Sequence, residues 1–249
     1  MSESEFKNYK IYDLTRVLSR DMPTLWMNLS WYRPPIMAQT TDFSGMYIEP
    51  DRKGFYETIH IIHSHTGTHM DAPAHYYNDQ DHWAMHNIPI DRLIGEGVIL
   101  GIPKGEKQEI TLEDLKKAKQ EIHDEDIVVF NTGWHKKFCG PITDWEKAKH
   151  YASNWPGIHE EVAEYLVDKK VKWVGIDHLC LDPYRHSEAG DNTWLVHQIL
   201  LKHNIPIVED VVGDIDKITD KRSVIMALPH PVFRADGFLC RALALLKEQ

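Results

Sequence analysis

Apolar and polar positions change their spacing several times along the chain, and each spacing predicts an element. Short apolar runs bounded by turn residues predict strands, whereas apolar residues three and four positions apart predict helices. Strands and helices that alternate with short connections are typical of an α/β fold. We therefore expect a single domain over residues 1–249, built on a mixed sheet with flanking helices. The expected strands span 97–103, 126–133, 171–177, 205–210, 223–229 and 238–246, and the expected helices span 111–122, 159–170 and 193–204.

The predicted helices begin and end at suitable residues. Thr111 stands at the N-cap of the first helix, and Asp114 follows three residues later, as in a capping box. Helix 159–170 has its acids first and its lysines last, which suits the helix dipole. Asn204 and Pro206 end the third helix.

The first 60 residues give a weaker pattern. Residues 10–18 predict an opening strand, and 56–63 alternate and are rich in β-formers, which predicts a second strand. The stretch 20–39 is rich in proline, tryptophan and methionine and has no period. We expect an irregular apolar loop there, which either covers a pocket or a neighbouring subunit or simply packs on the surface.

Composition and charge narrow the class of protein. The 249 residues include 38 acids against 28 Lys and Arg, a formal net charge of −10. This charge argues against nucleic acid and anionic membranes as partners. No run of about 18 apolar residues predicts a membrane span, and the first residues lack the pattern of a secretory signal. Cys139, Cys180 and Cys240 are odd in number and far apart, which favours reduced thiols in a cytoplasmic protein.

Four histidines and an aspartate lie close together in HSHTGTHMDAPAH, residues 63–75. All stand at odd positions, so in an extended strand their side chains would share one face. A helix is disfavoured, because the segment contains glycine, two threonines and proline. A straight strand would place His65 and Asp71 about 20 Å apart, too far to share one ion. The chain therefore has to bend, and Gly67 and Pro73 permit bending.

The side chains of this cluster, imidazole and carboxylate, form a ligand set that suits zinc, manganese or iron. A surface strand with solvated histidines is the alternative that the spacing leaves open. Asp177 and Glu209 each end a predicted apolar strand, and His197 lies on a predicted helix. Because functional groups collect at the carboxyl ends of strands in α/β sheets, one cation could satisfy His197 and Glu209 together with the early cluster. For Asp177, a capping role is equally open.

Three motifs of the chain resemble a known family. HTGTHMDAPAH (65–75) matches the pattern H-x-G-T-H-x-D-x-P-x-H of the cyclase-like metal-dependent hydrolases, a group that includes bacterial kynurenine formamidase and isatin hydrolase. VGIDHLCLDP (174–183) and HQILLKHNIPIVE (197–209) resemble two later elements of that family. The likeness extends from about residue 10 to the C-terminus and is weakest over 18–56 and 134–157.

The resemblance implies a metal site and a fold. In the family pattern, His65, His69 and Asp71 hold a first metal ion, and Asp71 bridges where two ions bind. His197 and Glu209 complete the second site. One or two divalent ions are expected, and zinc and manganese both fit these ligands. The implied fold is a swivelling β/β/α domain that assembles as a homodimer or homotetramer.

The resemblance also implies roles in catalysis. His75 would be the general acid and base, a task that suits histidine because imidazole titrates near neutral pH. By geometry alone His75 could instead be a further metal ligand. Trp26 is the best match for a tryptophan of the formamidases and could contact an aryl substrate, as could Trp31 and Tyr32. Core packing is the alternative role for each of these aromatic residues.

Together these features predict an enzyme that acts on a small molecule. Metal-activated water would cleave a C–N bond in an aryl formamide or a cyclic amide. Isatin-type ring opening, hydrolysis of a cyclic ester and non-catalytic metal binding are the alternatives. The sequence contains no Gly-x-Ser-x-Gly elbow, so a serine hydrolase is not expected.

Overall fold

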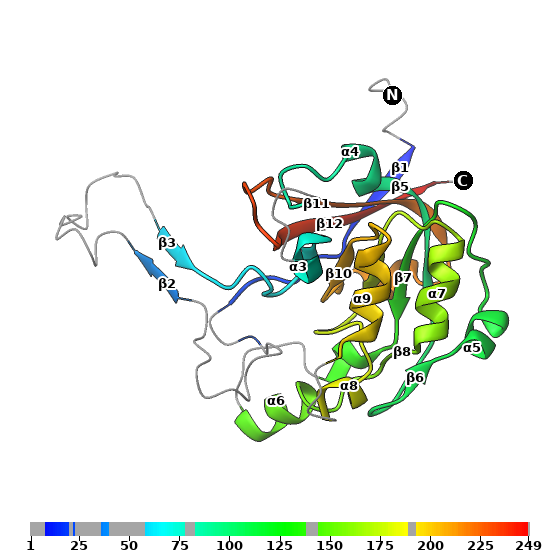
Figure 1. The fold of residues 1–249 in the computed structure, drawn as a ribbon, viewed down its shortest axis with the longest axis horizontal. Helices are drawn as coiled ribbons and strands as arrows, with labels where there is room; N and C mark the ends of the chain where they lie inside the picture. Colours follow the sequence, from blue (N-terminus) through cyan, green and yellow to red (C-terminus); the bar gives the residue numbers. More distant parts are fainter. Residues whose placement is uncertain are drawn as a thin grey trace.

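The centre of the molecule is an eight-stranded mixed sheet that closes on itself. Its strand order is β1-β12-β11-β5-β7-β9-β10-β4, and a further pairing of β4 with β12 produces a barrel-like ring (Figure 1). The strands are β1 (Tyr9–Asp13), β4 (His69–Asp71), β5 (Ile94–Gly101), β7 (Ile127–Asn131), β9 (Val174–Ile176), β10 (Ile207–Glu209), β11 (Arg222–Pro229) and β12 (Gly237–Lys247). The computed structural model describes residues 8–19, 22, 36–39, 58–77, 83–137, 144–188 and 193–248.

The ring combines a parallel part with an antiparallel part. Strands β5, β7, β9 and β10 run parallel to one another. The remaining strands join them in antiparallel pairs. The long strand β12 pairs with β4 at its beginning, where Gly237 lies opposite Asp71, and with β1 at its end, where Lys247 lies opposite Tyr9. The three residues of β4 therefore close the ring between β10 and β12.

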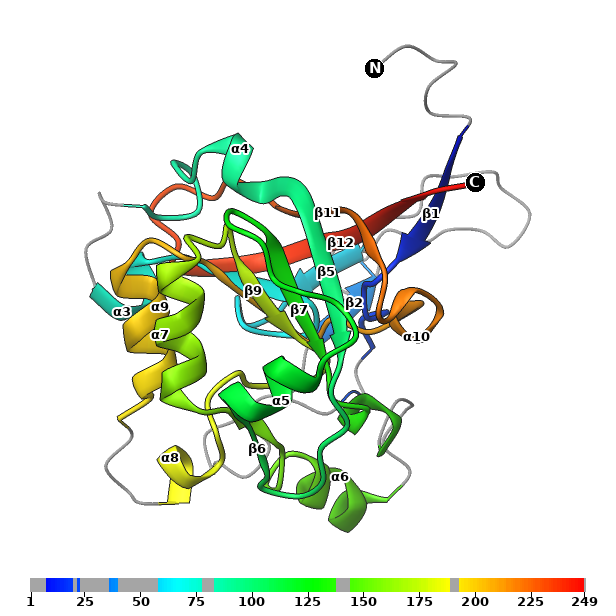
Figure 2. The ribbon, with the colours of Figure 1, turned by 90° about the vertical axis from the view of Figure 1, so that its right-hand side faces the viewer.

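Helices flank the barrel, which confirms the predicted α/β class. α7 and α9 lie side by side against the sheet (Figure 2), and the short α3 contacts α9. Among the described residues, no helix has the length and apolarity that a membrane span requires. The remaining elements are α3 (Ala74–Tyr77), α4 (Ile90–Leu93), α5 (Leu112–Lys117), α6 (Trp145–Tyr151), α7 (Glu160–Asp168), α8 (Arg185–Glu188), α9 (Leu195–Lys202), α10 (Ile215–Ile218), a 3-10 turn at Trp134–Lys137, and the short paired strands β6 (Glu109–Ile110) and β8 (Gly157–Ile158).

Apolar side chains bury both faces of the central strands. In β5, Val98 and Leu100 pack into the cluster that includes residues of α7 and α9. Ile99, between them, packs into a second cluster on the opposite face, together with residues of β11 and β12. Because successive residues of a strand point to opposite faces, a strand buried on both sides reads as a continuous apolar run. This is why strands such as 97–103 could be recognised in the sequence.

The helix start predicted at Thr111 is confirmed, but the helix is shorter than expected. The carboxylate of Asp114 accepts hydrogen bonds from the backbone N–H and the hydroxyl of Thr111, both at 2.8 Å. Helix α5 ends at Lys117 and not at residue 122. Ala118 adopts extended backbone, and Lys119 beyond it forms an ion pair with Asp220 at 2.8 Å.

The structure corrects the prediction of an irregular loop at the end of the stretch 20–39, whose residues 20, 21 and 23–35 lie outside the described part of the chain. Ile36–Gln39 form strand β2, which pairs antiparallel with β3 (Thr58–Ile61), and this two-stranded unit extends away from the barrel (Figure 1). A strand that is ordered by a distant partner leaves no periodic signal in its own four residues, so the local pattern missed it. The opening strand is also shorter than 10–18, since β1 ends at Asp13.

His178 lies two residues after the end of β9 and is fully buried. Within the described part of the chain, neither of its ring nitrogens has a hydrogen-bond partner. Burial disfavours the charged imidazolium and lowers the pKa of His178 to about 4. The native protein therefore keeps this ring neutral at pH values where the unfolded chain protonates it.

We expect the free energy of unfolding to fall as the pH drops from 6.5 towards about 4, because the unfolded chain then binds a proton that native His178 refuses. The loss amounts to at most about 3 kcal/mol, since one pKa unit corresponds to about 1.4 kcal/mol. Urea unfolding of the wild type and of His178→Leu across this window measures the effect. The variant should show a shallower pH dependence whatever its absolute stability, and equal slopes would contradict this explanation.

Candidate active site

Strand β4 places two predicted metal ligands on one face of the closing strand. His69 lies opposite Glu209 of β10 in the sheet register. Because side chains alternate along a strand, His69 and Asp71 point to the same side, and Met70 between them packs into an apolar cluster of the barrel. The sequence His-Met-Asp therefore anchors the ring through its middle residue and supplies two polar side chains on the other face.

Gly67 makes the bend that the sequence predicts. Its φ is +63°, in the left-handed region that favours glycine, and a Cβ there would lie 2.7 Å from Cδ2 of Leu18. The bend brings the backbone carbonyl of Gly67 to His69, whose Nδ1–H donates to it at 2.8 Å. This hydrogen bond sets the tautomer of His69 and leaves Nε2 facing Asp71 Oδ1 at 3.4 Å and Glu209 Oε2 at 3.6 Å.

His197, from helix α9, reaches the same two carboxylates from the other side. Its Nδ1 hydrogen-bonds Asp182, so Nε2 lies 3.4 Å from Asp71 Oδ2 and 3.5 Å from Glu209 Oε1. Asp71 and Glu209 thus each present one oxygen to His69 and the other to His197. Oε1 of Glu209 also accepts the backbone N–H of Leu181 at 2.8 Å, which holds that carboxylate in place.

Asp71 and Glu209 are both buried, so water screens their charges poorly. Burial and the charge of Asp71 raise the pKa of Glu209 above its usual value. Burial opposes ionisation of Asp71 too, but the charges of His65 and His69 outweigh it and hold the pKa of Asp71 well below its usual value. Two buried carboxylates this close require positive charge beside them, from protonated imidazoles or from a metal ion.

The donor atoms fit a divalent cation. Nε2 of His69 is buried and has no hydrogen-bond partner among the described residues, although it faces two carboxylates. His69, Asp71 and Glu209 each offer one atom within 4.8 Å of the others, and so do Cys180, His197 and Glu209. The other ring nitrogen of each histidine bonds an oxygen acceptor, as is usual for metal-binding histidines.

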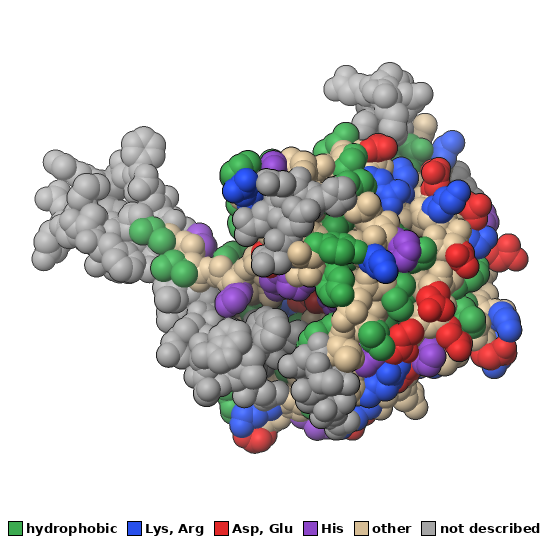
Figure 3. Space-filling model, in the orientation of Figure 1, with side chains coloured by type: hydrophobic (Ala, Val, Ile, Leu, Met, Phe, Trp, Pro, Cys, Tyr) green, Lys and Arg blue, Asp and Glu red, His purple; other side chains and the backbone are tan. Residues whose placement is uncertain are grey.

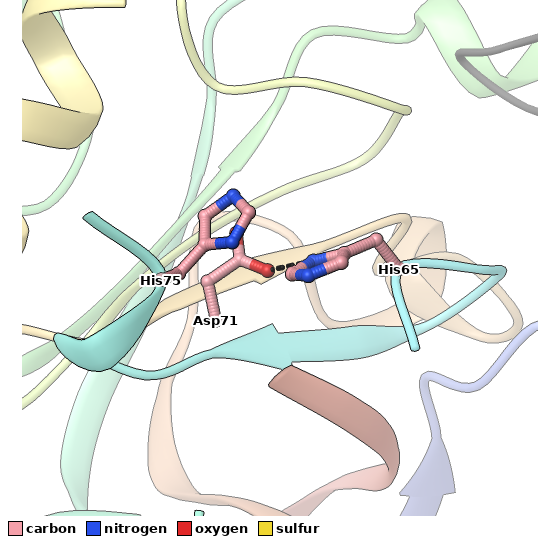
Figure 4. Close-up of side chains that lie close together, drawn as sticks. All are labelled: His65, Asp71 and His75. Carbon is pink, nitrogen blue, oxygen red and sulfur yellow. Dashed lines mark hydrogen bonds and ion pairs between the residues drawn. The ribbon is translucent and has the colours of Figure 1, made fainter. Parts of the chain in front are cut away.

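His65, Asp71 and His75 lie together at the other end of the cluster (Figure 4). His65 bonds Asp71 Oδ1 through Nδ1 at 2.5 Å and Asp236 Oδ2 through Nε2 at 2.9 Å. Burial disfavours its charge, but the charge of Asp71 and the hydrogen bonds outweigh burial and raise the pKa of His65 to about 10. His75 Nδ1 bonds the same oxygen of Asp236 at 3.1 Å. Hydrogen bonds from His65 and His75 hold the pKa of Asp236 well below its usual value.

A pocket opens directly over these groups, with about 830 Å³ of empty space that includes open solvent at its mouth. In Figure 3, histidine side chains reach the surface near the middle of the face shown. The ring of Trp194 lies edge-on to that of His197, with centroids 6.4 Å apart. Polar groups at the floor and apolar walls are the usual composition of a small-molecule site. The apolar and aromatic lining residues are Tyr76, Leu179, Trp194 and Leu201.

The structure brings all five predicted ligands into one cluster, with His75 beside them; these ligands are His65, His69, Asp71, His197 and Glu209. Asp177 is directed elsewhere, since it accepts hydrogen bonds from Thr132 and His135, and the capping explanation holds for it. His63 is exposed, and Trp26 lies outside the described residues.

Four residues at the site were not expected from the sequence: Asp182, Cys180, Asp236 and Trp194. Asp182 and Cys180 belong to the motif at 174–183, so the motif contained a signal for both. Asp236 precedes β12 in a turn that shares no motif or spacing with the histidine segment. It could be found only from the fold.

Known proteins resemble this chain in sequence and in fold. A family model named Cyclase, described as "Putative cyclase", matches residues 12–183. Kynurenine formamidase of Erythrobacter litoralis is 31% identical over 182 residues, which is 72% of each chain. Isatin hydrolase of Roseibium aggregatum is 26% identical over 253 residues and covers 96% of this chain and 92% of its own. Isatin hydrolase A from Ralstonia solanacearum shares the fold, with a TM-score of 0.78 at 21% identity over 98% of this chain and 94% of its own. The chain therefore belongs to the Cyclase family of metal-dependent hydrolases.

Proposed function

We propose that this metal-dependent hydrolase cleaves a C–N bond in an aryl formamide or a cyclic amide. The observation that carries the proposal is the convergence of two buried carboxylates, Asp71 and Glu209, with the ring nitrogens of His69 and His197. Such a set suits a divalent cation, and here it forms the floor of an open pocket. The relatives named kynurenine formamidase and isatin hydrolase support amide substrates.

In the proposed site, His65, His69 and Asp71 would hold a first zinc or manganese ion, and His197 and Glu209 would hold a second. Asp71 would contribute an oxygen to each ion, because its two oxygens face different histidines. Glu209 faces both sides in the same way, which supports two ions over one. When bound, such a cation lowers the pKa of water towards about 7 and polarises a carbonyl group.

We assign the proton transfer to His75. Because its Nδ1–H donates to Asp236, Nε2 of the neutral ring is the atom that can accept a proton. In the proposed reaction the oxygen of water adds to the amide carbon, His75 accepts the proton that water loses, and the C–N bond breaks as His75 returns that proton to the nitrogen. Asp236 is a positioning residue that holds the tautomer and the orientation of the ring.

The pocket favours a small aromatic amide. Tyr76 and Trp194 provide aromatic walls near the polar floor, and aromatic side chains stack on planar rings. Isatin, a cyclic amide fused to an aryl ring, is the second candidate. The isatin hydrolase relative matches 96% of this chain, whereas the formamidase relative matches 72% of it. This difference in coverage supports isatin-type ring opening as the second candidate function.

We also infer that the barrel-like ring and its helices form the swivelling β/β/α domain that the sequence resemblance implies. Residues 1–249 would form one such domain, since the match to an isatin hydrolase structure extends over 100% of this chain and 100% of that one, at a TM-score of 0.79. A homodimer or homotetramer in the cytoplasm is the proposed assembly.

An assay on N-formylkynurenine, isatin and an aryl lactone, with and without a chelator, tests the proposal. We expect turnover of at least one of the two amides, its loss on chelation, and its recovery when zinc or manganese is added back. Turnover of the lactone alone would replace C–N by C–O cleavage. A fully metal-loaded protein that acts on none of the three would favour the non-catalytic alternative.

A further inference from the structure

Cys180 lies in the pocket among the proposed ligands. It is 1% exposed and lines the same cavity as His69 and Asp71. Its sulfur, a ring nitrogen of His197 and a carboxylate oxygen of Glu209 lie within 4.8 Å of one another. The thiol therefore belongs to the His197 side of the cluster, where the proposed second ion has only two ligands besides the bridging Asp71.

Other buried atoms indicate independently that this cavity holds a ligand. Nε2 of His69, itself buried and without a hydrogen-bond partner among the described residues, is directed into it. On the opposite side of the cavity, Nδ1 of His197 hydrogen-bonds Asp182, so that Nε2 of His197 faces the carboxylates of Asp71 and Glu209. Both imidazoles are thus held with a nitrogen directed at the same carboxylates, and Cys180 borders the side occupied by His197.

We propose that Cys180 is a thiolate ligand of the second metal ion and directs that position towards Zn²⁺ in preference to Mn²⁺. The inference rests on the proposed two-ion site. On binding, the thiol releases its proton to solvent and the sulfur forms a bond to the cation, so that metal uptake and proton release are coupled.

The preference follows from the chemistry of the donors. Thiolate is a soft ligand that selects zinc, whereas manganese prefers carboxylate, carbonyl and water oxygens. With Cys180 the position offers one sulfur, one imidazole nitrogen and oxygens of Glu209 and Asp71, the number of ligands that tetrahedral zinc takes. Without the sulfur, the donors that remain are an imidazole and shared carboxylates, which suit manganese as well.

The test is the absorption spectrum of the full-length protein loaded with Co²⁺. A bond from cobalt to thiolate produces an intense near-ultraviolet charge-transfer band, which imidazole and carboxylate ligands do not. We expect this band in the wild type and in the double variant Cys139→Ser/Cys240→Ser, which retains Cys180 as its one cysteine. We expect Cys180→Ser to bind Co²⁺ without the band.

Dialysis against equal Zn²⁺ and Mn²⁺ measures selectivity. Because loss of even an outer-shell partner weakens metal binding by about 10-fold or more, the zinc-to-manganese ratio should fall at least about tenfold in Cys180→Ser. The double variant should retain the wild-type ratio.

The outcomes separate this inference from the proposed function. Cobalt bound without a thiolate band in the wild type, or a band that disappears in the double variant, overturns the role of Cys180 and leaves the histidine and carboxylate site standing. Failure of the wild type to bind Co²⁺, Zn²⁺ or Mn²⁺ overturns both. If Cys180→Ser does not fold, the presence or absence of the band in the double variant decides the question.

Discussion

Replacement of Asp71 by asparagine is expected to abolish both metal retention and hydrolysis. Asp71 is buried, and its two oxygens face His69 and His197 at 3.4 Å each. The amide of asparagine has nearly the same shape as the carboxylate, but it lacks the negative charge that attracts a cation. It also offers a single oxygen as a ligand, because its NH₂ group takes the place of the second oxygen. We expect kcat/KM to fall by at least about 10²–10³-fold, the range measured when one transition-state-stabilising group is removed.

Metal analysis of the purified Asp71→Asn variant beside its kinetics checks this expectation. Asp168→Asn is the matched control, because it makes the same chemical change at an exposed aspartate of α7. The control should retain the metal content and the activity of the wild type. An Asp71→Asn protein that keeps its full metal content and turnover would show that the cluster is not the metal centre.

Replacement of His75 by asparagine is expected to reduce kcat by about 10²–10⁴-fold while metal content is unchanged. The reason is the geometry of the ring: its Nδ1 bonds Asp236, and its side chain is 35% exposed, unlike the buried side chains of His69 and Asp71. His75 is therefore placed to exchange protons at the mouth of the cluster. The pH profile of kcat should lose the limb that reports the base.

His203→Asn, at an exposed histidine just after α9, is the matched control for His75→Asn. Two results would contradict the assignment of His75. A loss of metal together with activity would make His75 a further ligand, the alternative that the sequence left open. Full activity of His75→Asn would remove it from the reaction altogether.

The fold could be predicted where strands are buried on both faces and could not where order comes from distant pairing. β5 and β7 carry continuous apolar runs, and these survive in the sequence as clear signals. β4 has a single apolar residue, Met70, between two polar ones, and it is a strand because β10 and β12 flank it. β2 depends on β3 in the same way. The local pattern of apolar and polar residues does not reveal a strand that forms because of its pairing with distant strands.

More of the site than of the surrounding fold could be predicted, because clustered histidines and carboxylates are uncommon in a sequence and indicate metal binding. The odd-numbered histidines and Asp71 indicated a common face, and the bend they required is present at Gly67. Asp236 could not be predicted, because it reaches His65 and His75 through the chain reversal before β12 and not through a spacing visible in the sequence. For Asp177 the sequence left a ligand and a capping role equally open, and its hydrogen bonds to Thr132 and His135 decide for the second.

The three-residue length of β4 has a consequence for how the protein depends on its ion supply. The proposed histidine and carboxylate ligands come from β4 and the loop before it, from β10 and from α9. A bound cation would therefore link these elements at the point where β4 closes the ring. The free energy of metal binding would then also stabilise the pairing of β4 with β10 and β12, because an ion that binds only the folded state stabilises that state. Removal of the ion would then lower both the stability of the closed ring and the catalytic activity.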